Sequence, residues 1–241
     1  MASTQSNMSA NIVLGTYSMI TQFPHSAFLA IHIYTCGASI LNQVLLLTAA
    51  HCVYEHTNPE EYIAFVGHNT RQKGSQYAVL KFTIHEDYHS KFIWNDIALL
   101  RLKKDLNFGR NVARVLLLPD PPYDEMAAVA GWGVTEVGGS FVSNFLKHVS
   151  QKVYKRKACV LIGLKRVPRG TICGEHKEKN GHPEEGDSGS ALVVRGYIQI
   201  GIVSFNRPDV SKTNTVYTDT GYFYQWIKEN ARKLYCSDQM Q

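Results

Sequence analysis

Over most of its length the chain alternates between apolar and polar residues with a period of two, which is typical of β-strands with one buried face. In QYAVLKFTI, residues 76–84, the alternation places four apolar side chains on one face: Ala78, Leu80, Phe82 and Ile84. FLAIHIY, residues 28–34, alternates similarly, and ALVVRGYIQIGIVSF, residues 191–205, contains two such runs around Arg195-Gly196. That dipeptide predicts the tight turn of a β-hairpin.

Helical spacing is clear only near the end of the chain. From Gly221 on, apolar residues recur every three or four positions: Phe223, Trp226, Ile227, Ala231 and Leu234. Many short strands between turn signals, with one terminal helix, predict an all-β barrel or sandwich. The segment LLLPDPPYDEM, residues 116–126, is the candidate connection between two halves.

Composition limits the class of protein. The 241 residues are 44% hydrophobic and 19% charged, which is typical of a globular chain with a substantial core. A net charge of +5 over this length does not predict nucleic-acid binding, and no apolar run reaches the length of a membrane span. The first 15 residues lack the apolar run of a secretory leader. Five cysteines suit two disulfides and one remaining thiol in an oxidising compartment.

HEDYH, residues 85–89, matches the H-E-x-x-H pattern of zinc peptidases. That pattern works on a helix, where positions four apart are neighbours. Here the preceding residues alternate as a strand, which would separate His85 from His89 by roughly 13 Å. The Gly and His of the longer metalloprotease pattern are replaced by Phe92 and Asn95. We therefore expect a polar turn and no metal site at HEDYH.

Three other motifs point to a different chemistry. NDIALLRL places Asp96 before an apolar run suited to a buried strand, where a carboxylate needs hydrogen-bond partners. LTAAHC places His51 beside a cysteine, and GDSGS places Ser188 in a glycine-flanked turn. In this order and at these separations the motifs resemble those of the trypsin and chymotrypsin-like serine proteases. The resemblance extends from Ile12 to about Leu234.

The resemblance implies a chymotrypsin-like fold of two packed antiparallel six-stranded β-barrels with a C-terminal α-helix. The N-terminal barrel would comprise residues 12–118, and the C-terminal barrel with the helix would comprise residues 119–236. Residues 1–11 would form a propeptide-like extension.

The resemblance also implies the chemistry, in which His51, Asp96 and Ser188 form the catalytic triad of an endopeptidase, a hydrolase. His51 takes the proton of the Ser188 hydroxyl during attack and returns it to the leaving amine, while Asp96 orients His51. The backbone amides of Gly186 and Ser188 form the oxyanion hole. The alternative is a non-catalytic homologue that binds or regulates other proteins.

Two disulfides follow from the same resemblance. They pair Cys36 with Cys52 and Cys159 with Cys173. Cys236 is left as a free or intermolecular thiol.

Activation by proteolysis is a further expectation. In the family, a cut before an Ile-Val-Gly-Gly start frees an ammonium group, which here would be that of Ile12 pairing with Asp187. The residue before this cut is Asn11, and Leu14 replaces a glycine of the usual start. We therefore expect the chain to be a zymogen.

The specificity pocket departs from the trypsin pattern. Counting back from GDSGS places His182 where trypsins carry an aspartate, with Pro183 beside it, so cleavage after Lys or Arg is not expected. Asn206 and Thr215 stand where glycines usually line the pocket. His182 either favours acidic or amide side chains or fills the pocket as a packed neutral ring. The segment expected to pair with an extended substrate is Ser204, Phe205 and Asn206.

Few other partners are indicated. The loop at residues 67–76 contains no Asp or Glu, so we expect no calcium site and no cofactor. Between Lys147 and Arg169 lie eight Lys or Arg residues and no acid, which form either a solvated face or a docking face for an anionic glycan. The remaining expectations are a protein or peptide substrate, an activating protease, proteinaceous inhibitors, and a secreted monomer.

Overall fold

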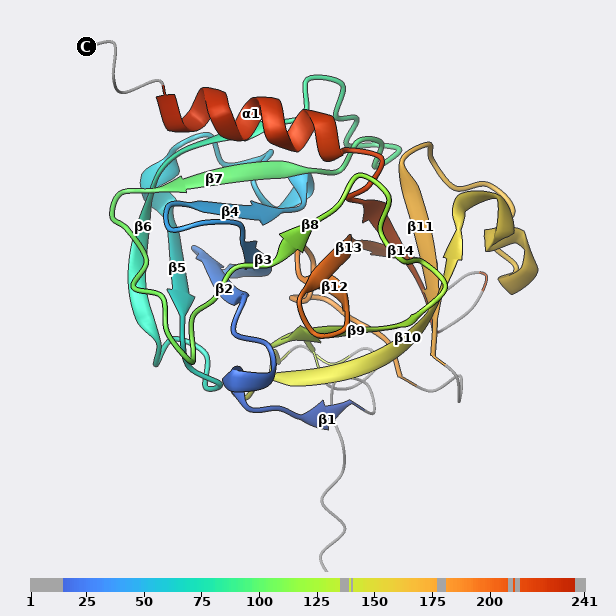
Figure 1. The fold of residues 1–241 in the computed structure, drawn as a ribbon, viewed down its shortest axis with the longest axis horizontal. Helices are drawn as coiled ribbons and strands as arrows, with labels where there is room; N and C mark the ends of the chain where they lie inside the picture. Colours follow the sequence, from blue (N-terminus) through green and yellow to red (C-terminus); the bar gives the residue numbers. More distant parts are fainter. Residues whose placement is uncertain are drawn as a thin grey trace, which may run out of the picture.

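The computed structural model describes residues 15–134, 139, 141–176, 181–207, 210 and 213–236. Six antiparallel strands of the first half close into a barrel, in the order β2-β3-β4-β7-β6-β5 (Figure 1). They are β2 (Ser26–Ile31), β3 (Tyr34–Ile40), β4 (Leu45–Thr48), β5 (Tyr62–Val66), β6 (Ser75–Ile84) and β7 (Ala98–Leu102).

Six strands of the second half close in the same way. They are β9 (Met126–Gly131), β10 (Lys147–Lys155), β11 (Thr171–Glu175), β12 (Ala191–Val194), β13 (Ile198–Asn206) and β14 (Asn214–Asp219). The barrel closes because β9 pairs with both β10 and β12, the two ends of the path β10-β11-β14-β13-β12. The predicted pair of six-stranded barrels is therefore confirmed.

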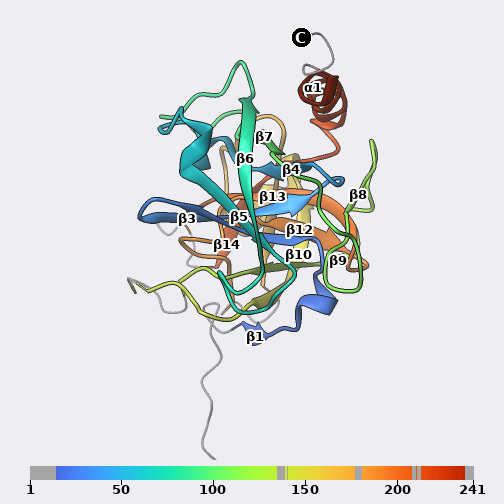
Figure 2. The same cartoon turned by 90° about the vertical axis from the view of Figure 1, so that its left-hand side faces the viewer.

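Segments near the two ends of the described chain each pack against the barrel formed by the other half. Strand β1 (Thr16–Tyr17) pairs with β10 of the second barrel, and the short strand β8 (Leu116–Leu117) pairs in parallel with β13. The predicted terminal helix is α1 (Tyr224–Cys236), whose buried Ile227 and Leu234 join the core of the first barrel. Figures 1 and 2 show α1 and β1 at opposite ends of the molecule.

A separate apolar cluster joins the barrels. Phe28 of β2 packs edge-on against Trp132, with 5.9 Å between ring centroids, and both are almost completely buried. Trp132 also donates from Nε1 to the carbonyl of Asn69, at 2.9 Å. Burial of an aromatic side chain of this size contributes about 1.5–3 kcal/mol. The cleft between the barrels is therefore lined by elements whose relative position is fixed by packing.

Residues 28–34 are divided where the sequence predicts one strand. A turn at His32 and Ile33 separates β2 from β3, and His32 has a φ of 49°. Because Ile31 pairs with Tyr34 across this turn, the run is a hairpin and not a continuous strand. The expectation of one alternating strand was wrong here. The alternation gave no signal for the turn, because Ile33 is apolar although it is 86% exposed.

Strand β6 is confirmed as a strand, but its predicted apolar face is wrong. Ala78 and Leu80 are exposed, whereas Val79 is completely buried. A β-bulge shifts the register between Val79 and Lys81, and an extra residue in a strand reverses which side chains face inward. Only after the bulge do Phe82 and Ile84 pack against the core as the alternation predicts.

The predicted hairpin between β12 and β13 is confirmed. Its turn residues, Arg195 and Gly196, have φ angles of 53° and 77°. Two consecutive positive φ angles match the right-handed twist of the strands they connect. No helix in the described part of the chain has both the length and the apolar character needed to span a membrane.

Candidate active site

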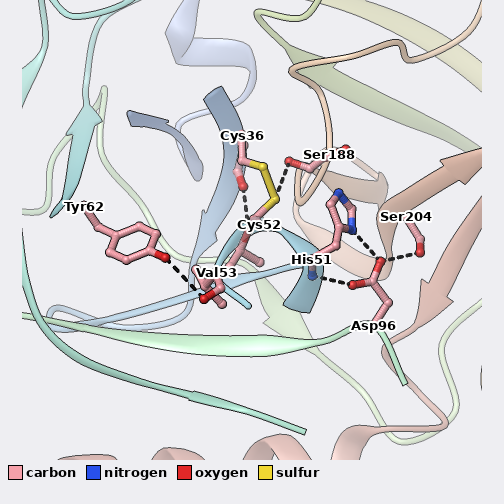
Figure 3. Close-up of a disulfide and its surroundings, with 10 residues drawn as sticks. Cys36, His51, Cys52, Val53, Tyr62, Asp96, Ser188 and Ser204 are labelled. Carbon is pink, nitrogen blue, oxygen red and sulfur yellow. Dashed lines mark hydrogen bonds and ion pairs between the residues drawn. A yellow bond between two sulfur atoms is a disulfide. The ribbon is translucent and has the colours of Figure 1, made fainter. Parts of the chain in front are cut away.

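Two of the predicted catalytic residues meet at the edge of the first barrel. His51 lies in a short 3-10 helix (Ala50–Cys52) directly after β4, and Asp96 lies two residues before β7. Because β4 and β7 are paired, with Thr48 opposite Ala98, their ends deliver the two side chains to one place. The Nδ1 atom of His51 lies 2.8 Å from Oδ2 of Asp96, and the His51 amide donates to Oδ1 at 2.9 Å (Figure 3).

The second barrel holds Asp96 in place. Ser204 of β13 donates from its hydroxyl to Oδ2 of Asp96, and Thr218 of β14 donates to the Asp96 carbonyl at 2.8 Å. Asp96 is 2% exposed, so the donors to its carboxylate, the Ser204 hydroxyl and the His51 amide, compensate for the loss of hydration of its charge. The sequence predicted Ser204 only as part of the substrate-binding strand. Its hydroxyl and that of Thr218 were missed, because nothing in their local sequence links them to residue 96.

The pair changes the basicity of the imidazole. Burial by itself lowers the pKa of His51, but the charge of Asp96 and the hydrogen bond to it outweigh burial and raise the pKa above its ordinary value. A more basic imidazole is a better acceptor for a hydroxyl proton.

Ser188 lies on the wall of the same cavity as His51. This cavity has a volume of about 650 Å³, and its lining also includes Gly186. Figure 3 shows the His51 ring lying between Asp96 and Ser188. Within the described residues no hydrogen bond joins the Ser188 hydroxyl to the His51 ring. Catalytic hydrogen bonds are often long in structures without substrate and tighten when substrate binds.

The loop around Ser188 is fixed through its backbone. The amide of Gly37 on β3 donates to the Ser188 carbonyl at 2.7 Å, and the amide of Gly189 donates to Val203 at 2.9 Å. A Cβ atom at Gly189 would lie 2.2 Å from the Thr48 hydroxyl, and its φ is +83°, so only glycine fits behind the serine.

Both residues of the predicted oxyanion hole, Gly186 and Ser188, line the cavity that His51 also lines. Gly186 has a φ of +90°, and a Cβ atom there would lie 2.9 Å from Val142. Within the described residues, the amides of Gly186 and Ser188 have no protein acceptor. Two residues on one cavity wall thus carry amides without an acceptor among the described residues, as an oxyanion hole requires.

Asp187 is completely buried beside this turn. Its carboxylate accepts from the amides of Gly133 at 2.7 Å and Glu184 at 3.0 Å. Burial nevertheless raises the pKa of Asp187 to about 6. No described residue forms an ion pair with it, and its expected partner Ile12 lies outside the described residues, as do Asn11 and Leu14.

The residues predicted to line the specificity pocket are buried or half-buried. His182 is 3% exposed, and its Nε2 atom lies 2.7 Å from a carboxylate oxygen of Glu184, which lowers the pKa of Glu184. Pro183 is buried, and its carbonyl accepts from the Asn206 side chain at 2.7 Å. Thr215 is completely buried in β14. Of the two interpretations of His182, the packed ring that fills the pocket is favoured.

The closed pocket contains polar atoms without partners. The Nδ1 atom of His182 and the amide oxygen of Asn206 are buried and accept or donate no hydrogen bond among the described residues. An unpartnered buried polar atom costs about 1–3 kcal/mol. Among the described residues, this group therefore lacks the satisfied contacts of an ordinary core.

A second, larger cavity of about 850 Å³ adjoins the candidate substrate strand. Phe205 and Asn206 of β13 form one side of it, and Phe92 and Trp94, stacked with 5.1 Å between centroids, form another. Four arginines also line it: Arg156, Arg166, Arg169 and Arg207. We call it the arginine groove. None of the described residues that line it is Asp or Glu.

The basic stretch from Lys147 to Arg169 is not one continuous face. Lys147 is 1% exposed, its ammonium group lies 4.5 Å from the centre of the Tyr17 ring, and burial lowers its pKa to about 8. The expectation that Lys147 belongs to a docking face was therefore wrong. Only the basic residues from Lys152 to Arg169 are exposed and could contact a partner.

HEDYH forms the expected turn. The amide of Tyr88 donates to the His85 carbonyl at 2.9 Å, and the His85 ring stacks on Trp226 of α1. Glu86 accepts from Trp226 Nε1 at 2.8 Å. These side chains are engaged with α1 and do not converge with His89 on a shared point.

Both expected disulfides are present. Cys36 of β3 is bonded to Cys52, which places one bridge directly beside His51, and Cys159 is bonded to Cys173 of β11. Cys236, the last residue of α1, is an exposed free thiol.

Comparison with known proteins agrees with this geometry. The family model described as Trypsin matches residues 12–227. Trypsin epsilon of Drosophila erecta is 32% identical over 205 residues, which cover 83% of this chain and 78% of the fly protein. Duodenase-1 of Bos taurus is 31% identical over 87% of this chain and 85% of its own length.

Among solved structures, one similar fold is a scabies mite inactivated protease paralogue, S-D1. The match has a TM-score of 0.81 with 26% identity and covers 91% of this chain and 97% of the mite chain.

Proposed function

Because the chain belongs to the trypsin family of serine proteases, we propose that it is a serine endopeptidase that cleaves protein substrates through a Ser188 acyl-enzyme. One observation carries the proposal. Asp96 is buried and hydrogen-bonded so that it holds His51 toward the cavity that contains Ser188. A carboxylate with this many donors and an imidazole partner is what a working general base requires.

The proposed reaction uses these residues in order. His51 accepts the Ser188 proton as the hydroxyl oxygen attacks the substrate carbonyl, and the imidazolium formed is stabilised by Asp96. The amides of Gly186 and Ser188 bind the oxyanion. His51 then returns the proton to the leaving amine. In the second step, His51 takes a proton from the water that attacks the ester and gives it to the Ser188 oxygen as that oxygen leaves.

Activation is part of the proposal. The buried carboxylate of Asp187, with a pKa of about 6 and no described ion-pair partner, is suited to receive an ammonium group. We propose that cleavage before Ile12 supplies it and that the uncut chain is a zymogen. Two disulfides suit an oxidising compartment, which supports an extracellular location.

The arginine groove indicates the class of substrate. It borders β13, on which an extended chain can add as a strand, and Arg166 and Arg169 are exposed with no described carboxylate partner. Acidic side chains on the bound substrate would therefore meet positive charge here, while the closed His182 pocket offers little. We propose specificity for acidic residues near the cut, in place of the Lys or Arg specificity of trypsins.

Labelling with a fluorophosphonate tests the endopeptidase. A chain beginning at Ile12 should be labelled at least about 100-fold faster than the chain with residues 1–11, because its free Ile12 ammonium group would pair with Asp187 and fix the turn that carries the oxyanion-hole amides. Ser188→Ala should abolish labelling. Absence of labelling in both forms would contradict the proposed activity.

A test of the groove compares Arg166→Gln and Arg169→Gln with Lys104→Gln, an exposed lysine outside the groove. The KM for an acidic peptide should rise about two- to fivefold in the groove variants only, since an exposed ion pair contributes about 0.2–1 kcal/mol. Equal KM values in all three variants would contradict selection by the groove.

A second function is favoured by the pocket. A closed pocket beside an intact His51–Asp96 pair is also consistent with a protein that binds without cutting, and the mite relative is described as an inactivated paralogue. Labelling of Ser188 without turnover of any peptide in a diverse library would support this alternative.

A further inference from the structure

A second group of titratable side chains lies at the rim of the cleft. His32 Nε2 lies 3.0 Å from Oε2 of Glu61, and His56 Nδ1 lies 3.1 Å from the same oxygen. All three ligand atoms lie within 4.8 Å of one another. Three residues from three different segments thus converge on one point, although neither histidine belongs to the sequence motif that suggested zinc.

The backbone places two of these residues together. Ile31, the last residue of β2, pairs with Tyr62, the first residue of β5. His32 directly follows Ile31, and Glu61 directly precedes Tyr62, so the pairing makes them neighbours. The φ of 49° at His32 belongs to the turn that begins the hairpin to β3.

The third residue is positioned by a buried tyrosine. The hydroxyl of Tyr62 donates to the backbone carbonyls of Val53 and His56, and Tyr62 itself is completely buried. Tyr62 therefore anchors the loop that carries His56 to the strand that follows Glu61. The cluster rests on the barrel through ladder pairing and a side-chain anchor, so its members keep their relative positions.

The donor set selects a class of ion. Two imidazole nitrogens and one carboxylate oxygen suit a first-row transition dication, above all Zn²⁺, whereas calcium and magnesium prefer oxygen ligands. Zn–N and Zn–O bonds of about 2.0–2.2 Å separate tetrahedral ligands by about 3.3 Å. The two observed nitrogen–oxygen distances are already close to that value.

An ion can reach this cluster from solvent. The side chains of His32, His56 and Glu61 are 56%, 29% and 27% exposed. The group formed by Cys36, His51 and Cys52 has similar spacing, but its sulfurs are joined in a disulfide and offer no thiolate. The rim cluster is therefore the better candidate of the two.

We propose that His32, His56 and Glu61 form a binding site for Zn²⁺, with the fourth position open to water. His56 also lines the cavity that contains His51 and Ser188. A bound ion would tie the hairpin at His32 to the loop at His56 across one rim of this cavity. If the chain is the protease proposed above, zinc slows cleavage of protein substrates.

Direct titration tests the site without relying on activity. Zn²⁺ is titrated by calorimetry into the Ser188→Ala, Cys236→Ser chain, which can neither cleave itself nor offer the free thiol. One ion should bind per chain, and Co²⁺ in the same site should show the strong visible absorption of a tetrahedral complex. Since loss of even an outer partner of a ligand costs 10–100-fold in affinity, His56→Gln and Glu61→Gln should weaken binding at least about tenfold.

The matched control is His89→Gln, an exposed histidine of the HEDYH turn, which should bind zinc as tightly as the background. His32→Gln is the third test variant, and its position in a hairpin turn should leave the fold intact. Thermal melting without metal checks this for each variant. Equal affinity in all variants, or no binding by the background, would overturn the site. Zinc binding without any effect on cleavage would support the binding site but contradict its regulatory role.

Discussion

Asp96 and His182 are both buried side chains of the candidate site, but they differ in how many of their polar atoms have a hydrogen-bond partner. Asp96 accepts from His51, from the Ser204 hydroxyl and from backbone, and is almost completely buried. His182 is equally buried, but its Nδ1 atom has no hydrogen-bond partner among the described residues. The contacts of Asp96 are suited to hold His51 in one orientation, whereas an unpartnered buried nitrogen at His182 lowers the stability of the fold.

The difference separates two parts of one function. His51 and Asp96 have the contacts that orient the imidazole, whereas His182 and Asn206, expected in the specificity pocket, leave buried polar atoms without a partner among the described residues. A chain with this combination can retain chemistry while changing what it recognises. The following experiments test each side of the comparison.

The largest effect is expected at Asp96. Asp96→Asn keeps the size of the side chain but stabilises the wrong tautomer of His51, so kcat/KM should fall about 10⁴-fold. In the unaltered protein, activity should rise with pH through a pKa above the ordinary histidine value of 6.5, because Asp96 raises that pKa and only neutral His51 is a base. A profile centred well below 6.5 would contradict the electrostatic role of Asp96.

The next effect concerns stability and Asp187. Its pKa is about 6 in the folded chain and about 3.8 when unfolded, so the buried carboxylate costs nothing below pH 4 and costs most above pH 6. The loss amounts to about 3 kcal/mol at most. Denaturant unfolding of the uncut chain should show this decline, and Asp187→Asn should remove it. A chain cut before Ile12 should show the opposite slope, because an ammonium partner lowers the pKa.

An intermediate effect is expected in the pocket. His182→Ala removes the partner of Glu184 and leaves a cavity, so the free energy of unfolding should fall by about 1–3 kcal/mol. The opened pocket should also raise kcat/KM for short peptides with medium-sized side chains. His25→Ala, at a buried histidine of the first barrel, should lower stability without this gain. Equal activity in both variants would mean that the pocket is not the obstacle.

The smallest effect is expected at Ser204. Ser204→Ala removes one of several donors to Asp96, which is worth about 1.5 kcal/mol, or about tenfold in kcat/KM. The pH profile should shift as well, since Asp96 then orients His51 less firmly. A tenfold loss without any change in the profile would indicate a general packing defect. Ser39→Ala, which removes a buried hydroxyl on β3, is the matched control.

Much of the fold followed from the sequence because its signals are local or shared with a known family. Alternation marked the strands, helical spacing marked α1, and Arg195-Gly196 marked a hairpin turn. The failures have one cause. The bulge in β6 and the turn at His32 change which side a residue faces without changing its polarity, and alternation records polarity alone.

The site shows the same limit at longer range. The motifs identified His51, Asp96 and Ser188, but no local pattern could join Thr218 to the Asp96 carbonyl, a contact between residues 122 positions apart. Lys147 looked like part of a basic surface because charge is usually exposed; its burial under Tyr17 depends on β1 crossing to the second barrel. Such contacts are set by topology, which the sequence pattern does not contain.

The packing of α1 against the first barrel has a consequence for how the protein folds during synthesis. During synthesis the first six-stranded barrel leaves the ribosome long before α1, yet Ile227 and Leu234 of α1 belong to its core. Until the last turn of the chain emerges, that barrel has an uncovered apolar side, a state prone to aggregation. We therefore expect truncation before Tyr224 to impair folding of the first barrel, although every one of its strands would still be present.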